Sequence, residues 1–151
     1  TSSYELLALN QRIEGFKAIM ETRYPLIDIV DTIETRDGTI AFQKAVSLLE
    51  NVGDLKGIYI TSELASEVCK AVKFLGKSEE IKIVYFHFYP ENVQLLKEGV
   101  IDFAIGQDPV AQGFKPLKIL FEQLFNGKQP ESEHIRTVIE IRESESIDMS
   151  N

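Results

Sequence analysis

The chain has 151 residues, 44% of them hydrophobic and 26% charged, which is typical of one soluble globular domain with a core of its own. Its formal net charge of −8 disfavours a domain that grips the phosphate backbone of nucleic acid by itself. The apolar runs are far shorter than the roughly 18 residues of a membrane-spanning helix, and the single cysteine, Cys69, excludes an internal disulfide and is expected to be buried.

The first third of the chain predicts a helix, a strand and a second helix. Apolar residues at helical spacing predict a helix over about 4–22, which ends before a Tyr-Pro pair. The aliphatic and β-branched residues from Leu26 to Ile33 predict a strand. A turn at Asp37 precedes the second helix, and Gly53 follows its end.

Strands and helices alternate through the rest of the chain. The long helix of this part has an N-cap residue in Asp108, a proline suited to its first position, and Gly127 just past its end. Pro116 lies inside that helix and predicts a kink. The alternation predicts an α/β fold in which helices flank a parallel sheet. In chain order, we predict a strand over 57–61, a helix over 64–75, a strand over 81–86, a helix from Pro90 to Gly99, a strand over 100–105, a helix over 109–126 and a strand over 135–141.

Polar side chains follow three successive predicted strands. Thr61 and Ser62 come after the first, His87 after the second and Gln107 after the third. Ligands bind at the carboxyl edge of open α/β sheets, so these positions form a binding-site hypothesis. The sequence leaves open the alternative that such residues only cap the helices that follow.

The segment Gly99–Gly113 resembles the late part of the type I periplasmic-binding-protein fold, in the variant found in the effector-binding domain of LacI/GalR-type transcriptional regulators. The resemblance extends to residues 11–16, 55–60 and 81–86. Order and spacing agree from about residue 10 to residue 141.

In that family two α/β subdomains clamp a small ligand, and the resemblance implies how this chain is divided. Residues 1–107 are expected to be the C-terminal subdomain, and 108–130 a crossover helix that packs on a missing N-terminal subdomain. Residues 134–142 are expected to be the last strand, and 143–151 a polar tail. Because the chain opens on Thr1 rather than Met, we expect it to be part of a longer protein.

This division implies that a sheet edge and a helix surface lack the elements that cover them in the family. A central strand, which lies between those matching 26–33 and 57–61, is missing from the chain, and an open edge there invites pairing. The helix over 109–126 lacks the subdomain on which it packs, so we expect it to fold back or to dock on a partner chain by exchange.

The resemblance also assigns ligand-binding residues. Arg12 matches an arginine that donates to ligand hydroxyls, a role that suits the fixed donors of a guanidinium. Ser62 and Glu63 stand where sugar-binding relatives carry asparagine and aspartate. Gln107 matches a glutamine near the hinge, which can both donate and accept.

His87 departs from the family pattern, because relatives carry an aspartate there that accepts hydrogen bonds from sugar hydroxyls. A histidine changes the geometry of that acceptor and adds pH dependence, so we expect an unusual or phosphorylated ligand, or lost binding. The neighbouring rings of Phe86, Phe88 and Tyr89 offer a stacking face for a ligand, and we predict that Phe88 contacts it. The alternative reading places these rings in the core.

A dimer interface is expected on the helix over 64–75, because the matching helix of LacI-type regulators lies in their interface. Val68, Ala71 and Val72 are the candidates. Periodicity does not distinguish this role from packing against the sheet.

The sequence therefore predicts the effector-binding and dimerising part of a cytoplasmic LacI-type regulator, which binds a sugar or a related small molecule. It would be a homodimer, contact DNA only through a headpiece outside this chain, and bind no membrane. The alternatives are a periplasmic sugar-binding protein of a transport system and the extracytoplasmic sensor module of a membrane kinase. We expect no enzyme, cofactor or metal site, because no nucleophile elbow, phosphate loop, dinucleotide fingerprint or metal-ligand spacing is present.

Overall fold

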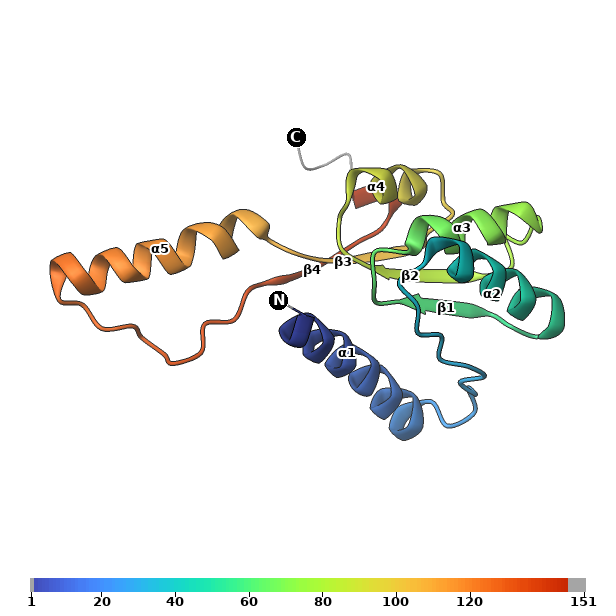
Figure 1. Cartoon of the computed structure of the whole chain (residues 1–151), viewed down its shortest axis with the longest axis horizontal. Helices are drawn as coiled ribbons and strands as arrows, with labels where there is room; N and C mark the ends of the chain where they lie inside the picture. Colours follow the sequence, from blue (N-terminus) through green and yellow to red (C-terminus); the bar gives the residue numbers. More distant parts are fainter. Residues whose placement is uncertain (1, 147–151) are drawn as a thin grey trace.

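The computed structural model of the chain describes residues 2–146, with side chains from Leu7 onward (Figure 1). Within these described residues, four strands form one sheet in the order β1-β2-β3-β4. β1, β2 and β3 are parallel, and β4 is antiparallel to β3. The elements are α1 (Ser2–Arg23), α2 (Gly38–Asn51), β1 (Gly57–Ile60), α3 (Ala65–Phe74), β2 (Lys82–Phe86), α4 (Pro90–Lys97), β3 (Phe103–Gln107), α5 (Pro109–Asn126), β4 (Ile139–Arg142) and a short 3-10 turn, η1 (Ser144–Ser146).

The α/β class with helices flanking the sheet is confirmed, but the sheet is mixed rather than parallel throughout, because β4 is antiparallel. Two predicted helix starts show why the chain folds as it does. The carboxylate of Asp37 accepts from the N–H groups of Thr39 and Ile40, at 2.8 and 3.1 Å. Asp108 accepts from the N–H of Ala111 at 2.9 Å at the start of α5. Each cap satisfies first-turn donors that a helix cannot pair internally.

The core lies on one face of the sheet, between the strands and the layer of α2, α3 and α4. Strand register places Ile60, Ile83, Tyr85 and Ala104 on this face, and all four side chains are buried. Residues on alternate positions point to opposite faces of a strand. The largest fully buried side chains are Tyr85, Leu49, Ile81, Ile83, Leu96, Ile101, Val72 and Cys69.

The opposite face of the sheet carries Tyr59 and Phe86, and α1 packs there. The ring of Phe16 stacks on that of Tyr59 with centroids 4.8 Å apart. α1 does not reach the far side of this face, so Phe103 on β3 and Ile141 on β4 stay exposed.

The prediction of a strand over 26–33 is wrong. These residues form an irregular connection between α1 and α2, and Leu26 is 98% exposed. β1 is the edge of the sheet among the described residues, and the segment over 26–33 pairs with neither β1 nor another strand there. A β-prone sequence forms a strand only where a neighbouring strand accepts its backbone hydrogen bonds.

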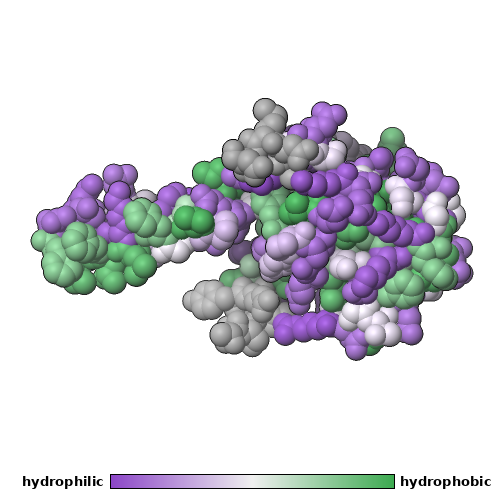
Figure 2. Space-filling view, turned by 90° about the horizontal axis from the view of Figure 1, so that it is seen from above, coloured by the Kyte–Doolittle hydropathy of each residue, from purple (hydrophilic) through white to green (hydrophobic). Residues whose placement is uncertain are grey.

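The helix α5 projects away from the sheet as an arm (Figure 1), and it does not fold back onto its own domain. We call α5 and the return segment, residues 127–138, the arm. Figure 2 shows a green apolar strip along the projecting end of the molecule. Docking of α5 on a partner chain stays a prediction. The exposed large apolar residues of α5 are Val110, Phe114, Leu117, Leu120, Phe121, Leu124 and Phe125.

The expected tail over 143–151 begins with η1, in which the Ser146 hydroxyl bonds to the backbone of Glu143 at 2.9 Å. Residues 147–151 of that tail lie outside the described part of the chain.

Candidate ligand-binding site

The carboxyl ends of β1, β2 and β3 meet at one edge of the sheet, and the side chain of Arg12 reaches this edge from α1. The Nη1 group of Arg12 donates to the carbonyl oxygen of Thr61 at 3.1 Å, just past the end of β1. Its guanidinium carbon lies 3.7 Å from the ring centroid of Phe86, the last residue of β2. Arg12 therefore bridges two neighbouring strands at the edge where α/β folds bind ligands.

Helical spacing explains how Arg12 comes to this position. Phe16 lies four residues later on the same face of α1, and its stacking on Tyr59 holds the helix against β1. The guanidinium face on an aromatic ring is a cation–π contact, which fixes the plane of the group.

Five side chains gather around this contact, and we name them the Arg12 cluster: Arg12, Tyr59, Phe86, His87 and Tyr89. The His87 ring lies 5.5 Å from the Phe86 ring and 5.4 Å from the Tyr89 ring, between centroids. The charge of Arg12 lowers the pKa of both Tyr59 and His87.

The backbone of His87 is strained, with φ at 91° in the left-handed region that favours glycine. Its N–H donates to the Ile105 carbonyl at 2.7 Å, which joins the ends of β2 and β3. Strained residues of this kind gather at functional sites.

The electrostatics of the Arg12 cluster leave one positive charge among neutral groups. Burial lowers the pKa of His87, and Arg12 lowers it further against an opposing effect of Glu63, so the imidazole is neutral at pH 7. Burial raises the pKa of Tyr59. Burial also lowers the pKa of Arg12, although a guanidinium keeps its charge in proteins.

Arg12 has no acidic partner among the side chains that the structure describes, where its contacts are Thr61 and Phe86. Ion pairs in the described chain lie elsewhere, such as Lys82 with Asp102 at 2.8 Å.

Two helices begin at this edge without a side-chain cap. α3 follows Leu64 and α4 follows Tyr89, and neither residue's side chain bonds to the first turn. The first-turn N–H groups of a helix carry partial positive charge. α5 also begins at this edge, but the Asp108 carboxylate caps it.

The structure places Arg12 and His87 against the same ring, that of Phe86. Ser62 follows Thr61 directly and is half-buried beside the cluster's acceptor. Gln107 lies at the end of β3, where its Oε1 accepts from Nε2 of Gln112 on α5 at 2.9 Å. Gln107 thus belongs to the base of the arm and makes no described contact with Arg12.

Phe88 does not join the cluster, in contrast to its expected role in stacking on a ligand. Its ring packs against the core next to Gly106, and the guanidinium of Arg142 lies 4.5 Å from its centroid. The glycine leaves room that this ring fills, so Phe88 takes the alternative role of a core residue.

The residues predicted for a dimer interface also pack against the core. Ala71 and Val72 have no exposed surface, because α3 packs them against the core next to α2. Val68 is half-buried against the same core. Ala71 and Val72 therefore offer no side-chain surface to a second copy.

Sequence reasoning missed Tyr59 and the carbonyl of Thr61. The alternation of β1 signals that Tyr59 points away from the face of Ile58 and Ile60, towards α1. No sequence pattern marks a backbone carbonyl as an acceptor.

Cys69 is buried in α3, as the helical pattern predicts, and burial raises the pKa of its thiol to about 12. Within residues 2–146, no cluster of His, Cys, Asp and Glu is arranged to hold a metal ion. The helices in that range are too short or too polar to cross a membrane.

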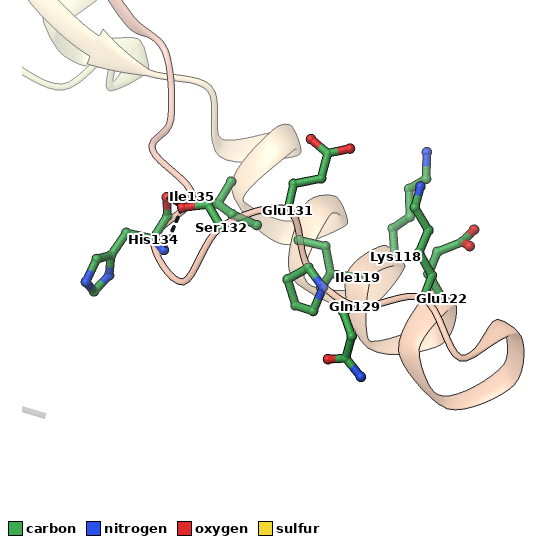
Figure 3. Close-up of a pocket in the computed structure, with 10 residues that line it drawn as sticks. Lys118, Ile119, Glu122, Gln129, Glu131, Ser132, His134 and Ile135 are labelled. Carbon is green, nitrogen blue, oxygen red and sulfur yellow. Dashed lines mark hydrogen bonds between the residues drawn. The ribbon is translucent and has the colours of Figure 1, made fainter.

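A separate hollow of about 410 Å³ lies in the arm, between α5 and the return segment (Figure 3). Lys118 and Glu122 extend from α5, while Glu131 and His134 come from the return segment, and His134 points away from the helix. None of the residues that line this hollow belongs to the Arg12 cluster, and its lining contains both lysine and glutamate side chains. We therefore place the candidate site at the sheet edge.

Comparison with known proteins gives a consistent picture. Residues 2–129 match the family model described as a periplasmic binding protein domain. A sugar-binding protein of a sugar ABC transporter from Bacillus halodurans is similar in structure, with a TM-score of 0.84 and 26% identity over 94% of this chain and 52% of that one. An ABC transporter solute binding protein from Agrobacterium vitis, bound with α-D-tagatopyranose, has a TM-score of 0.80 and 26% identity over 92% and 46% of the two chains.

A third similar structure is assigned as a LacI transcriptional regulator from Bacteroides fragilis, with a TM-score of 0.81 and 23% identity over 95% of this chain and 49% of that one. The chain thus spans about half the length of the solved structures that it matches. No curated protein sequence matches it.

Proposed function

Because the chain belongs to the periplasmic binding protein domain family, we propose that it is the C-terminal half of a two-part clamp for a sugar or a related small molecule. The Arg12 cluster is this half's share of the ligand site. The function is binding without catalysis, and the other half of the clamp supplies the opposing wall and excludes water.

The position of Arg12 carries this proposal. Its guanidinium is fixed between the Phe86 ring and the Thr61 carbonyl, at the edge where β1 and β2 end. A donor group that is already oriented loses little conformational entropy when a ligand binds. Tyr89 is 42% exposed and offers a ring face beside it.

The sugar class is supported by the names of similar proteins. The Bacillus halodurans protein is a sugar-binding protein, and the Agrobacterium vitis protein holds a tagatopyranose. A pyranose ring has an apolar face for an aromatic side chain and hydroxyls for a guanidinium, which is the chemistry of the Arg12 cluster.

We infer further that the clamp serves a LacI-type transcriptional regulator, a cytoplasmic homodimer whose DNA-binding headpiece lies outside this chain. The segment Gly99–Gly113 and the likeness to the Bacteroides fragilis fold support this reading. Ligand binding would shift the population of open and closed clamps and so the spacing of two headpieces. On α3, the exposed Lys70, Lys73 and Phe74 are available for contact between copies.

The alternative is an exported sugar-binding protein of a transport system. The Bacillus halodurans structure favours it, since both its identity of 26% and its TM-score of 0.84 exceed those of the regulator.

The gene sequence upstream of Thr1 separates the two functions. A helix-turn-helix segment followed by a second α/β subdomain supports the regulator. A signal peptide in that position contradicts it and identifies an exported binding protein.

Ligand binding is tested by calorimetry with a panel of pentoses and hexoses, on the protein expressed from the complete gene. We expect Arg12→Ala to weaken the affinity about 10- to 100-fold, because a charged donor to a ligand is lost. Arg23→Ala is the matched control, an exposed arginine in the last turn of the same helix. Equal affinity of Arg12→Ala and the parent protein would remove the Arg12 cluster from the site.

A further inference from the structure

A buried hydrogen bond closes the connection from β2 to α4, residues 86–91, which we call the site loop. The bond joins Tyr85, near the end of β2, to Asn92, in the first turn of α4. On the basis of the proposed function, we propose that Tyr85 and Asn92 are positioning residues, whose hydrogen bond holds the site loop in the conformation that binds the ligand.

The site loop supplies three of the five side chains of the Arg12 cluster, namely those of Phe86, His87 and Tyr89. The guanidinium of Arg12 lies 3.7 Å from the centroid of the Phe86 ring, and the centroids of the His87 and Tyr89 rings are 5.4 Å apart. A binding site has to be held within about 0.5 Å of its productive geometry. The conformation of the site loop is therefore part of what a ligand recognises.

The hydrogen bond itself lies inside the domain. Nδ2 of Asn92 donates to the hydroxyl of Tyr85 at 2.7 Å, Tyr85 has no exposed surface, and Asn92 is 2% exposed. A hydrogen bond in such surroundings is electrostatically stronger than one in water. Because both partners are buried within this half of the clamp, the bond does not depend on the other half.

Both ends of the site loop are held by hydrogen bonds. At its end, the N–H of Asn92 donates to the Tyr89 carbonyl at 2.9 Å, while the side chain of Asn92 joins the same turn to Tyr85. At its start, the N–H of His87 donates to the Ile105 carbonyl at 2.7 Å, and the φ of His87 is 91°. A strained residue persists only where its surroundings restrain it. The bond between Tyr85 and Asn92 is one of these restraints.

The polar pair is not the most stable way to fill this space. Oδ1 of Asn92 has no partner among the described residues, and a buried polar atom without a partner is unfavourable. Replacing both side chains by apolar ones of similar shape can be neutral or stabilising. A directional hydrogen bond, however, specifies one arrangement of α4 on β2 more closely than apolar contacts do. We therefore expect the pair to contribute orientation more than stability.

The double variant Tyr85→Phe/Asn92→Leu separates these two contributions. It is made in the protein expressed from the complete gene, and calorimetry measures its affinity for the pentose or hexose that the parent protein binds most tightly. We expect the affinity to fall about 3- to 10-fold, because side chains of the site loop must then be ordered when the ligand binds. Urea unfolding confirms that the variant is folded.

Ile81→Val is the matched control. Ile81 is buried directly before β2, at the end of the strand opposite to the site loop. The change removes one methylene group from the core and lowers stability. We expect it to leave the affinity for the sugar unchanged.

The pKa of His87 gives a second measurement, which needs no ligand. Burial and the charge of Arg12 lower this pKa, against an opposing effect of Glu63. NMR titration of protein with labelled histidine measures it, and His87→Asn identifies the resonance. In the double variant we expect the pKa of His87 to rise towards its ordinary value of about 6.5, because a loosened loop exposes the ring to water. In Ile81→Val it should stay as in the parent.

The outcomes that contradict the inference are distinguishable from failure of the proposed function. Parent-like affinity or a parent-like pKa of His87 in the double variant shows that the pair does not position the site loop. Equal losses of affinity in Ile81→Val and the double variant show that affinity follows stability alone, which also refutes the inference. Absence of binding for every sugar in the parent protein refutes the proposed function, and the pKa of His87 then decides whether the pair holds the loop.

Discussion

The Phe88 ring lies so close to Gly106 that a Cβ atom at position 106 would stand 2.0 Å from Cε2 of that ring. Real Cβ atoms do not approach other atoms to this distance. Gly106 lies in the middle of the pairing of β3 with β4, opposite Glu140. The glycine is therefore required for space beneath an aromatic ring.

This contact predicts that Gly106→Ala is destabilising. The added methyl group must push Phe88 out of its place in the core, and overpacking of this kind costs about 1–3 kcal/mol of unfolding free energy. Urea unfolding measures the loss. Gly113→Ala in α5 is the control, since nothing lies within 4 Å of its added Cβ, and alanine in a helix should gain about 0.5–1 kcal/mol. Combining Gly106→Ala with Phe88→Ala should cost less than the sum of the two changes, and strict additivity would contradict the account.

A buried polar pair supplies the second prediction. Nδ2 of Asn92 donates to the hydroxyl of Tyr85 at 2.7 Å, and both residues are buried. Oδ1 of Asn92 has no partner among the described residues. Tyr85→Phe would leave Asn92 without its acceptor, so we expect a loss of about 1–3 kcal/mol. The double variant Tyr85→Phe/Asn92→Leu should be more stable than Tyr85→Phe alone, as measured by a double-mutant cycle. A double variant that is less stable would show that the pair is not coupled in this way.

The third prediction concerns pH. Burial and Arg12 lower the pKa of His87 in the folded protein, so the unfolded chain binds this proton more readily than the folded one. The resulting contribution to stability is fully present above the unfolded-state pKa of about 6.5 and is lost as the pH falls from there through the folded-state pKa.

We therefore expect the unfolding free energy to fall between pH 7 and pH 5 more steeply in the parent than in His87→Asn, a residue that tolerates positive φ. His134→Asn is the control, because that side chain is exposed on the return segment. Parallel pH profiles for the parent and His87→Asn would refute the lowered pKa.

The fourth prediction concerns the irregular segment over 26–33. Its amide hydrogens should exchange rapidly with solvent, because the segment pairs with no strand, whereas those of β2 should be protected in the middle of the sheet. Mass spectrometry of exchanged peptides measures both. Leu26→Ser should change stability by less than about 0.5 kcal/mol, since the side chain is 98% exposed. Ile83→Ala, at a fully buried position, should cost about 2–5 kcal/mol. Slow exchange over 26–33 would mean that the segment pairs with another strand in solution.

The order of helices and strands could be predicted because local patterns encode it. Asp108 satisfies the first turn of α5 wherever that helix lies, and Gly127 ends it at a φ of 64°. Local sequence could not decide whether residues 26–33 form a strand, because a strand needs a paired neighbour and this segment pairs with none of the four strands of the described sheet. A high β-propensity shows that a segment can form a strand, but pairing with another strand decides whether it does.

In the candidate site, too, some features follow from local sequence and others depend on the tertiary fold. Arg12 and Phe16 are four residues apart on one helix, so their shared face was readable from the sequence. The orientation of Phe88 was not, because it depends on the space left by Gly106, a residue on another strand. Likewise, the helical spacing of apolar residues in α3 is visible in the sequence. Which side of α3 packs against α2 depends on the tertiary fold, and this packing buries Ala71 and Val72.

The pairing of Gln107 with Ile139 has a consequence for how the chain is connected. The chain leaves the sheet on β3 and re-enters it on the adjacent, antiparallel β4, so residues 108–138 form an insertion whose two ends meet at one rung of the ladder. The entropy of closing a loop depends only weakly on its length. The arm therefore connects β3 to β4 in the way that a hairpin turn connects two antiparallel strands. A two-residue turn could join the same two strand ends. We therefore expect the pairing of β3 with β4 to survive replacement of the arm by a short turn.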